Sequence, residues 1–441
     1  MNSHSTPSFF SFRSLRFATL GALSLAAALT AHAANTDAGA FFFRDGDRAM
    51  ILGDSITQQR LYSTLVETYV VSRFPEWKIT FRNTGWSGDT MGLRTRGGID
   101  KGFERDLKPV NATAVTIDFG MNDGRAGERG AADYIANAEK LSGKFAALGT
   151  RMTFITSSAE ERYQDGQPAG SAYNTILRSY SDGLKKFADG KDLPFIDQLN
   201  PMITVIEKGR EAGVLSAKEG GVRLVNDGVH PNWDGSLVMA ASILKGLHAP
   251  ADVSSVEINA TTGAVKAEKA SVTGVTTTEG VSFTRLDASM PWPIGASITV
   301  GLKIPGFAPL DDLSRYTLKV TGLTAASYDV AADGKSLGKY TKEQLAAGVN
   351  LTGPAFAALP EMKALFDAVV TKNQLFYSRW REVQIAEIPT WIDAKAVEEG
   401  RAKRLVELDA DIVKAEARLS ELRAPKPHQW TVKPVAAAVA Q

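Results

Sequence analysis

The sequence predicts a three-layer α/β fold over residues 40–250, followed by a β-rich segment over 251–355 and a helical segment over 356–423. As far as residue 248, short apolar runs alternate with amphipathic stretches, a pattern typical of β-α-β units around a parallel sheet. Beyond residue 250 the composition changes to Thr, Val, Ser and Gly in period-two runs, which indicates strands. The length of 441 residues also favours more than one structural unit, because single cores stop growing near roughly 250–300 residues.

The α/β segment divides into strands and helices that alternate along the chain. Strands are predicted at residues 49–53, 78–83, 114–119, 152–156 and 195–197. Helices are predicted at residues 58–73, 131–148, 173–188, 201–211 and 233–247. This alternation predicts a sheet enclosed between two layers of helices.

The C-terminal half has its own local patterns. Strands are predicted at residues 254–258, 281–284, 297–302, 317–320, 327–331 and 337–340, with a hairpin turn at Asp333-Gly334. Thr341 and Gln344 resemble a capping box at the start of a short helix. Residues 360–383 and 392–423 are predicted helices, and the second has heptad-spaced apolar residues that we expect to pack on the chain's own body rather than on another copy: Leu405, Leu408, Ile412, Ala415, Leu419 and Leu422. The Pro/Ala-rich tail over residues 424–441 is predicted to be flexible.

The first 33 residues have the pattern of a signal peptide. Arg13 and Arg16 precede an apolar run over residues 17–29, and Ala31-His32-Ala33 supplies the small residues of a cleavage site. We therefore expect export to the periplasm or the extracellular space. No later segment approaches the roughly 20 apolar residues of a membrane span, so the mature chain is expected to have none.

Composition restricts the possible partners and chemistries. Cleavage after residue 33 would remove two arginines and no acidic residue, so the net charge would change from +1 to −1. A near-neutral chain without a basic stripe is not expected to bind nucleic acid, and its substrate is expected to be uncharged or modestly charged. Because there is no cysteine, a thiol nucleophile and a thiolate metal site are excluded. The histidines outside the signal peptide are His230, His248 and His428.

Two short motifs contain residues that could act as a nucleophile and a general base, and both lie near the ends of predicted strands and helices. Gly53-Asp54-Ser55 follows an apolar strand, which puts a hydroxyl at the carboxyl edge of the sheet, where open α/β sheets bind ligands. In Asp227-Gly228-Val229-His230, the carboxylate can hold imidazole Nδ1 and leave Nε2 for a serine. The alternatives are a loop with a helix cap for the first motif and an Asx turn with a surface histidine for the second.

Two further blocks follow predicted strands and reach the same edge. Gly88 lies in Ser87-Gly88-Asp89-Thr90, and Asn122 lies in Gly120-Met121-Asn122-Asp123. A glycine N–H and an asparagine amide are the donors that an oxyanion hole requires. A turn glycine and a helix cap are the structural alternatives.

Together the four blocks resemble, in order and spacing, those of the SGNH (GDSL-like) hydrolase family, over about residues 45–248. The resemblance implies a flavodoxin-like three-layer α/β/α fold and ester hydrolysis through an acyl-enzyme, without a metal or organic cofactor. It implies that Ser55 is the nucleophile, His230 the base and Asp227 its partner. The backbone N–H groups of Ser55 and Gly88 and the amide of Asn122 would form the oxyanion hole.

The Gly-Asp-Ser-Ile-Thr block is more similar to secreted bacterial carbohydrate O-acetylesterases than to lipases, so acetylated carbohydrate or polysaccharide is the expected substrate. Trp86 is expected either to stack on a sugar or to line the acyl pocket, or else to be a core aromatic. Arg94 and Arg96 are either contacts for an acidic sugar or solvated charges. The alternatives are a broad esterase, lipase or thioesterase, and, in another class, a glycan-binding envelope scaffold with a vestigial site that works through residues 251–423.

Overall fold

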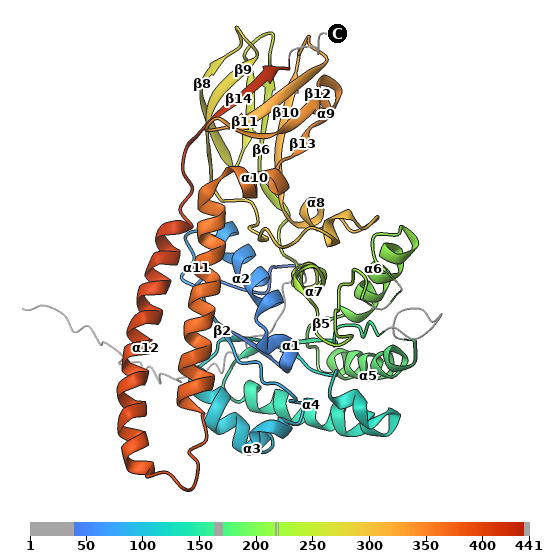
Figure 1. The fold of residues 1–441 in the computed structure, drawn as a ribbon, viewed down its shortest axis with the longest axis vertical. Coiled ribbons are helices and arrows are strands. Elements are labelled where there is room, and N and C mark those ends of the chain that lie inside the picture. Colours follow the sequence, from blue (N-terminus) through green and yellow to red (C-terminus); the bar gives the residue numbers. More distant parts are fainter. Residues whose placement is uncertain (1–38, 163–170, 217, 219, 436–441) are drawn as a thin grey trace, which may run out of the picture. The chain divides into compact units, whose positions relative to one another are not determined.

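A computed structural model describes residues 39–162, 171–216, 218 and 220–435 (Figure 1). The predicted signal peptide lies outside the described residues. The first part of the chain forms a five-stranded sheet in the order β2-β1-β3-β4-β5, and every pair is parallel. Its strands are β1 (Arg48–Gly53), β2 (Thr80–Asn83), β3 (Ala114–Asp118), β4 (Arg151–Ile155) and β5 (Phe195–Ile196). The predicted α/β class is confirmed, and the strand order is the flavodoxin-like one.

Helices cover both faces of this sheet because successive strand residues point in opposite directions. Ala49 and Ile51 of β1 enter one apolar core together with α2 (Leu61–Arg73), α6 (Leu199–Glu211) and α7 (Trp233–Gly246). Met50 and Leu52 enter a second core with α4 (Ala131–Ala146) and α5 (Ser171–Gly190). The result is the three-layer arrangement.

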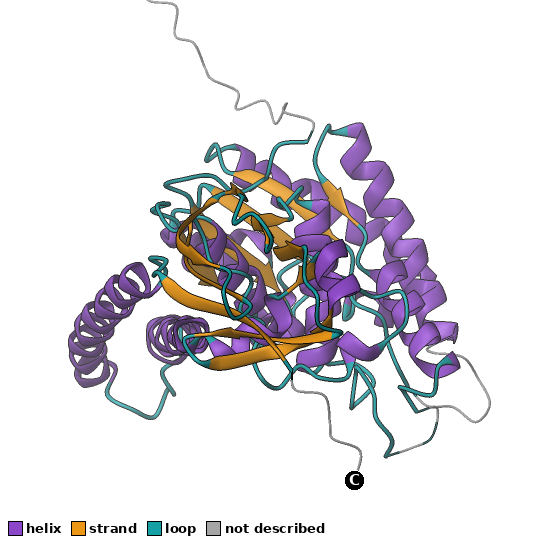
Figure 2. Cartoon of the chain, turned by 90° about the horizontal axis from the view of Figure 1, so that it is seen from above, coloured by secondary structure: helices purple, strands orange, loops and turns teal. Residues whose placement is uncertain are grey.

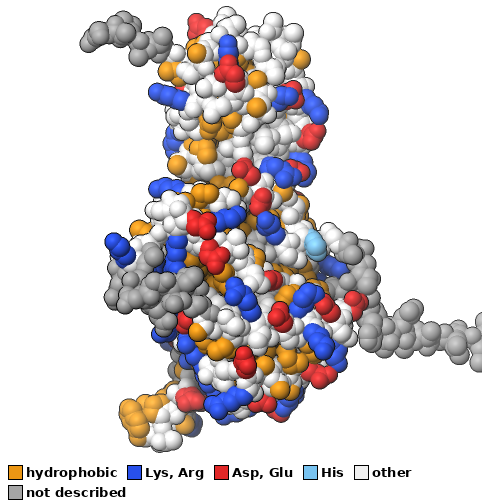
Figure 3. Space-filling model, turned by 90° about the vertical axis from the view of Figure 1, so that its right-hand side faces the viewer, with side chains coloured by type: hydrophobic (Ala, Val, Ile, Leu, Met, Phe, Trp, Pro, Cys, Tyr) orange, Lys and Arg blue, Asp and Glu red, His pale blue; other side chains and the backbone are white. Residues whose placement is uncertain are grey.

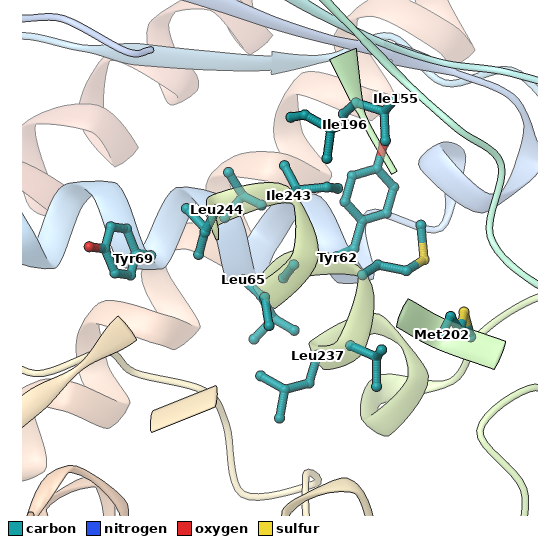
Figure 4. Packing of buried hydrophobic residues seen from close by; sticks show 14 of the residues in the cluster. Tyr62, Leu65, Tyr69, Ile155, Ile196, Met202, Leu237, Ile243 and Leu244 are labelled. Carbon is teal, nitrogen blue, oxygen red and sulfur yellow. The ribbon is translucent and has the colours of Figure 1, made fainter. Parts of the chain in front are cut away.

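The first core is built around α2 and α7. Figure 4 shows Tyr62, Leu65 and Tyr69 of α2 beside side chains of α7, with the Tyr62 ring directed toward two strand residues. The labelled neighbours are Ile155, Ile196, Met202, Leu237, Ile243 and Leu244. All of these side chains are buried, and each contributes on the order of 2 kcal/mol by leaving water.

The β-rich part consists of two sheets, ordered β13-β10-β6-β7 and β12-β11-β14-β9-β8. Their inward side chains, including fully buried Trp430, share one apolar core. The strands are β6 (Asp252–Asn259), β7 (Val265–Glu268), β8 (Ala270–Thr276), β9 (Val281–Asp287), β10 (Arg315–Thr321), β11 (Ser327–Ala332), β12 (Lys335–Thr341), β13 (Val349–Asn350) and β14 (His428–Pro434). The β11–β12 hairpin turns at Asp333-Gly334, both with positive φ, as predicted.

Two sequence predictions in this half are wrong. The tail predicted to be flexible contains β14, which pairs with β9 on one side and β11 on the other, so its backbone is held on both edges. The strand predicted over residues 297–302 is absent, and the 3-10 helix Gly301–Lys303 lies there instead. Asp234 Oδ1 accepts the N–H groups of Thr299, Val300 and Gly301 at 3.0, 2.9 and 2.8 Å, which curls this backbone around one carboxylate.

The boundary near residue 250 does not divide the hydrophobic core of the α/β part. The segment after β9 returns to it, and Trp292 Nε1 donates to the Leu65 carbonyl at 2.9 Å. Four more apolar side chains of this segment are buried in the same core as α2 and α7: Ile294, Ile298, Ile304 and Leu313. The C-terminal half therefore completes the core of the α/β part.

The chain then forms α11 (Pro360–Tyr377), the π-helical turn η7 (Ser378–Gln384) and α12 (Ala394–Leu422). Figure 2 shows α11 and α12 side by side, and they pack against each other. Leu408, Ile412, Leu419 and Leu422 of α12 are buried, so the heptad face packs on the chain's own body. The shorter helices are α1 (Ser55–Gln58), α3 (Ile99–Gly102), α8 (Pro309–Leu313), α9 (Lys342–Ala347) with the predicted capping box, and α10 (Thr352–Ala358).

His428 links three elements of the C-terminal half. Its Nδ1 lies 2.7 Å from Asp333 Oδ2 in the β11–β12 turn, and its Nε2 lies 2.7 Å from Glu361 Oε1 in the first turn of α11. The hydrogen bond to Glu361 raises the pKa of His428 to about 9, against the opposing effect of burial and together with the bond to Asp333. The imidazolium therefore holds β14, the hairpin and α11 together.

The two ion pairs of His428, with Asp333 and with Glu361, are called the His428 clamp below, and they predict that the stability of the protein depends on pH. Because the folded pKa of about 9 lies above the ordinary value of 6.5, the stabilisation is complete below pH 6.5 and is lost as the pH rises through 9. We expect the thermal midpoint to fall over that interval, and His428→Gln to lower stability at pH 7 by about 2 kcal/mol and to flatten the fall. Circular dichroism melts at pH 6, 7, 8 and 9.5 measure both effects. An unchanged slope in the variant would contradict the clamp.

Candidate active site

Ser55 is held in a tight turn between β1 and α1. β1 ends at Gly53, and a side chain there would bring Cβ within 2.1 Å of Thr57 Oγ1 and 2.7 Å of the Asp118 carbonyl. Asp54 caps the helix, since its Oδ1 accepts the Ile56 N–H at 2.9 Å. Ser55, half-buried, is the first residue of α1. Its hydroxyl therefore lies at the carboxyl edge of the sheet, where a helix N-terminus favours negative charge.

The three residues that the sequence selected for acyl transfer lie together. Ser55 Oγ is 2.8 Å from His230 Nε2, and His230 Nδ1 is 2.7 Å from Asp227 Oδ2. Burial alone would raise the pKa of Asp227, but hydrogen bonds from the backbone and the ring of His230 outweigh it and hold this pKa below its ordinary value. An ionised Asp227 can stabilise a protonated imidazole, which is what a serine nucleophile requires of its base.

The loop that carries His230 is anchored by Glu161, which sequence reasoning missed. Glu161 Oε2 accepts the N–H groups of Leu224 and Val225 at 3.0 and 2.8 Å, and its own N–H donates to the Gly228 carbonyl at 3.0 Å. Its side chain is fully buried. Because the carboxylate reaches across more than 60 residues of sequence, no local pattern could have identified this role.

The candidate oxyanion donors come from three loops that are joined by hydrogen bonds. The Trp86 N–H donates to the Gly53 carbonyl at 3.0 Å, and Asn122 Nδ2 donates to the Asp89 carbonyl at 2.8 Å. Gly88 has a φ of +75°, which favours glycine. Within the part of the chain that the structure describes, the N–H groups of Ser55 and Gly88 have no acceptor. They remain available to an incoming oxygen.

Four carboxyl groups lie near these loops; Asp54, Asp89 and Asp118 are buried and Asp123 is half-buried. Burial raises the pKa of Asp54 to about 7, with further contributions from Asp123 and Asp89, and burial raises the pKa of Asp123 to about 7. The pKa of Asp118 is also raised, by burial and by Asp54. Asp89 instead pairs with Arg96 at 2.6 Å. Protonation of part of the Asp54, Asp118 and Asp123 population, together with the pairing of Asp89, lowers the negative charge near the place where an oxyanion would form.

Trp86 and the arginines singled out from the sequence lie in distinct environments. The half-buried Trp86 packs edge-on against Trp380, with ring centroids 6.2 Å apart, and the Arg381 guanidinium lies 4.0 Å from its ring centroid. Arg96 is buried against Asp89, so both interpretations of Arg96, as a sugar contact and as a solvated charge, are wrong. Arg94 Nη2 donates to the Gly88 carbonyl at 2.9 Å.

The remaining histidines lie elsewhere, His428 in the β-rich part and His248 directly after α7. Within the described ranges, no group of three or more His, Asp or Glu side chains is arranged to hold a metal ion. In the same ranges, no helix combines the length and the apolar character needed to cross a membrane.

Comparisons with known proteins bear on the family and the fold of the chain. The model of the GDSL-like Lipase/Acylhydrolase family matches residues 51–237, the part that contains all of the site residues. A gut microbial diltiazem-metabolizing enzyme shares the fold, with a TM-score of 0.74 and 22% identity over 90% of this chain and 99% of that one. An acetylxylan esterase from Geobacillus stearothermophilus aligns with a TM-score of 0.38 and 19% identity over 47% of this chain and 97% of that one. Among curated proteins, none matched the sequence.

Proposed function

Because the model of the GDSL-like Lipase/Acylhydrolase family matches residues 51–237, we propose that the chain is a serine esterase that works through Ser55, His230 and Asp227. The hydrogen-bonded chain from Ser55 Oγ through His230 to Asp227, with distances of 2.8 and 2.7 Å, is the observation that carries this proposal. A neutral imidazole between a hydroxyl and a carboxylate can take the hydroxyl proton during attack on a carbonyl.

In this mechanism, Ser55 Oγ bonds to the ester carbonyl carbon while its proton passes to His230 Nε2. The tetrahedral intermediate collapses, the alcohol leaves with the proton from His230, and the acyl group remains on Ser55. Water then attacks the acyl-enzyme, with His230 again accepting the proton, and the acid is released. Asp227 stabilises the imidazolium in both steps.

The oxyanion would be held by three donors: the N–H groups of Ser55 and Gly88 and the side-chain amide of Asn122. Asn122 Nδ2 donates to the Asp89 carbonyl at 2.8 Å, which fixes the amide, and to Asp54 Oδ2 at 3.4 Å, and the substrate oxygen would replace the longer of these two bonds. Each such donor contributes on the order of 3 kcal/mol to transition-state stabilisation.

We further propose that the substrate is an O-acetylated carbohydrate and that the protein is exported, as the N-terminal pattern of residues 1–33 indicates. The neighbourhood of the triad is polar, with Gln58 Oε1 accepting the Ser87 N–H at 2.7 Å and Arg94 bound to Gly88. The Trp86 ring already stacks with the Arg381 guanidinium, 4.0 Å from its centroid, so a sugar would have to displace Arg381 to stack on that face. These groups suit a small acyl group on a polar alcohol better than a long acyl chain.

The proposal predicts a preference for short acyl groups. On 4-nitrophenyl esters, we expect kcat/KM to fall by about tenfold or more from acetate to octanoate, and acetate to be released from at least one O-acetylated polysaccharide. A Ser55→Ala preparation serves as the blank. A maximum at long chains would favour a lipase, whereas no turnover together with binding of glycans would favour a scaffold with a vestigial site.

A further inference from the structure

We propose that this site takes an ester of an anionic, carboxylate-bearing sugar, which it recognises through five arginines around the triad: Arg60, Arg94, Arg125, Arg162 and Arg381. This inference rests on the proposed function and names its substrate class. The five residues are called the arginine collar below. Each is tied by a contact to one of the loops that carry the triad and its oxyanion donors.

Three members of the collar adjoin catalytic positions directly. Arg94 Nη2 donates to the carbonyl of Gly88 at 2.9 Å. Arg125 follows Asn122 by three residues, and its N–H donates to the Asn122 carbonyl at 3.4 Å. Arg162 packs on the loop of Asp227 and His230, since a Cβ on Gly228 would lie 2.4 Å from Arg162 Cγ. The three arginines thus belong to, or pack against, three different loops of the site.

The other two members are positioned by the C-terminal helices. Arg60 Nη1 donates to the Gln58 carbonyl at 2.8 Å, and its guanidinium lies 4.2 Å from the Tyr377 ring centroid. Arg381 lies 4.0 Å from the centroid of Trp86. Arg60 Nη2 also donates to Gln374 Oε1 at 3.0 Å, so both of its Nη groups are engaged and Arg60 contributes charge rather than free donors. Stacking of Arg381 on an aromatic ring leaves the donor edge of its guanidinium for a carboxylate. In this way α11 and η7 take part in the surroundings of the site.

A buried carboxylate orients two of the arginines. The Glu160 side chain is only 7% exposed, yet it pairs with Arg162 Nε at 2.9 Å and lies 3.6 Å from Arg125 Nη2. Arg125 also lies 4.2 Å from the Tyr173 ring centroid. The side chains of Arg125 and Arg162 nevertheless stay 47% and 52% exposed. Long side chains held at one end lose less entropy on binding, so both guanidinium groups are prepared to bind an anion.

The acidic groups nearby do not cancel the collar. Glu160 is shared by two arginines, Asp227 is engaged by His230, and Glu382 lies near Arg60. The raised pKa values of Asp54 and Asp123 reduce their negative charge at neutral pH. Among the described residues, the five arginines of the collar outnumber these three acidic side chains, Glu160, Asp227 and Glu382, although the whole chain has a net charge of only +1. On the face in Figure 3, basic and acidic side chains are interspersed.

The chemistry of arginine favours a carboxylate as the recognised group. Its planar guanidinium forms paired, charge-assisted hydrogen bonds with a carboxylate, which a neutral sugar cannot match. A concentration of one sign of charge around a site also accelerates the arrival of an oppositely charged substrate, and salt weakens this effect.

The test compares an O-acetylated methyl galacturonide with its uronamide, which has the same acetyl group and no charge. At about 20 mM salt we expect kcat/KM to be about tenfold higher for the acid, mainly through KM, and this ratio to approach one at about 0.5 M salt. Arg125→Gln/Arg162→Gln should lower the ratio at low salt to about twofold. Arg418→Gln, an exposed arginine of α12 paired with Glu421, is the matched control and should keep the wild-type ratio.

A wild-type ratio near one, or a ratio unaffected by Arg125→Gln/Arg162→Gln, overturns the inference. If the double variant does not fold, the single variant Arg162→Gln, at an exposed side chain, takes its place. Calorimetric titration of galacturonate and galactose into Ser55→Ala supplies a readout without turnover, and equal affinities would also overturn the inference. Absence of hydrolysis of both esters and of 4-nitrophenyl acetate would instead contradict the esterase proposal, so the two failures are distinguishable.

Discussion

Replacing Ser55 by alanine is expected to lower kcat on 4-nitrophenyl acetate by about 10⁵-fold or more, because the acyl-enzyme cannot form without the hydroxyl. The fold should persist, since the turn depends on Gly53 and on the Asp54 cap rather than on Ser55 Oγ. Stopped-flow and long-time assays measure the residual rate, and circular dichroism checks the fold. A residual rate within tenfold of wild type would contradict the assignment of the nucleophile.

The companion variant His230→Ala should show a loss of the same order, and the double variant should lose little more, because nucleophile and base act as one unit. His248→Ala is the matched control. It removes an imidazole that follows α7, outside the Ser55–Asp227 network, and should keep kcat within about twofold of wild type. A serine-directed phosphonate should modify Ser55 alone, and modification of a different serine would show that the nucleophile is not Ser55.

The parallel sheet could be predicted because its determinants are local. Apolar runs such as residues 49–53 form the strands, and the amphipathic runs between them give the helices. β14 could not be predicted in this way. Its two central apolar side chains, Trp430 and Val432, lie in a short stretch with Lys and Pro. That stretch becomes a strand because β9 and β11 supply hydrogen bonds on both sides.

The candidate triad could be proposed from short motifs because Ser55, Asp227 and His230 sit where a strand or a loop ends. The residues that hold the triad and its loops in place could not be predicted in this way. Glu161 holds residues 224–228 through hydrogen bonds between segments more than 60 residues apart, and no spacing rule links a carboxylate after β4 to that loop. The contacts of Trp86 could not be predicted either, because Trp380 and Arg381 come from a helix almost 300 residues later in the sequence. Long-range packing, not local propensity, determines these contacts.

Such packing also joins α11 to α2 through a buried ion pair. Lys372 Nζ lies 2.8 Å from Glu67 Oε1, and the two side chains are 1% and 3% exposed. The ammonium also donates to the Phe81 carbonyl at 3.0 Å, and Asn373 Nδ2 donates to Glu67 Oε2 at 2.9 Å. Burial raises the pKa of Glu67 and lowers that of Lys372, and each partner's charge opposes that shift. Each ion is therefore tolerated only in the presence of the other.

Lys372→Met is accordingly expected to destabilise the protein by about 3–5 kcal/mol, because it leaves the Glu67 carboxylate buried without a cation. The double variant Glu67→Leu/Lys372→Met should recover at least half of that loss, since an apolar pair carries no charge that must be desolvated. Lys363→Met is the matched control on the same helix. Its side chain is 64% exposed, so the change should stay within about 0.5 kcal/mol. Urea unfolding followed by tryptophan fluorescence compares the three variants. If Lys372→Met were as stable as Lys363→Met, or if the double variant were no more stable than Lys372→Met, the uncompensated buried carboxylate could not be the cause of the loss, and the ion pair would not be what joins α11 to α2.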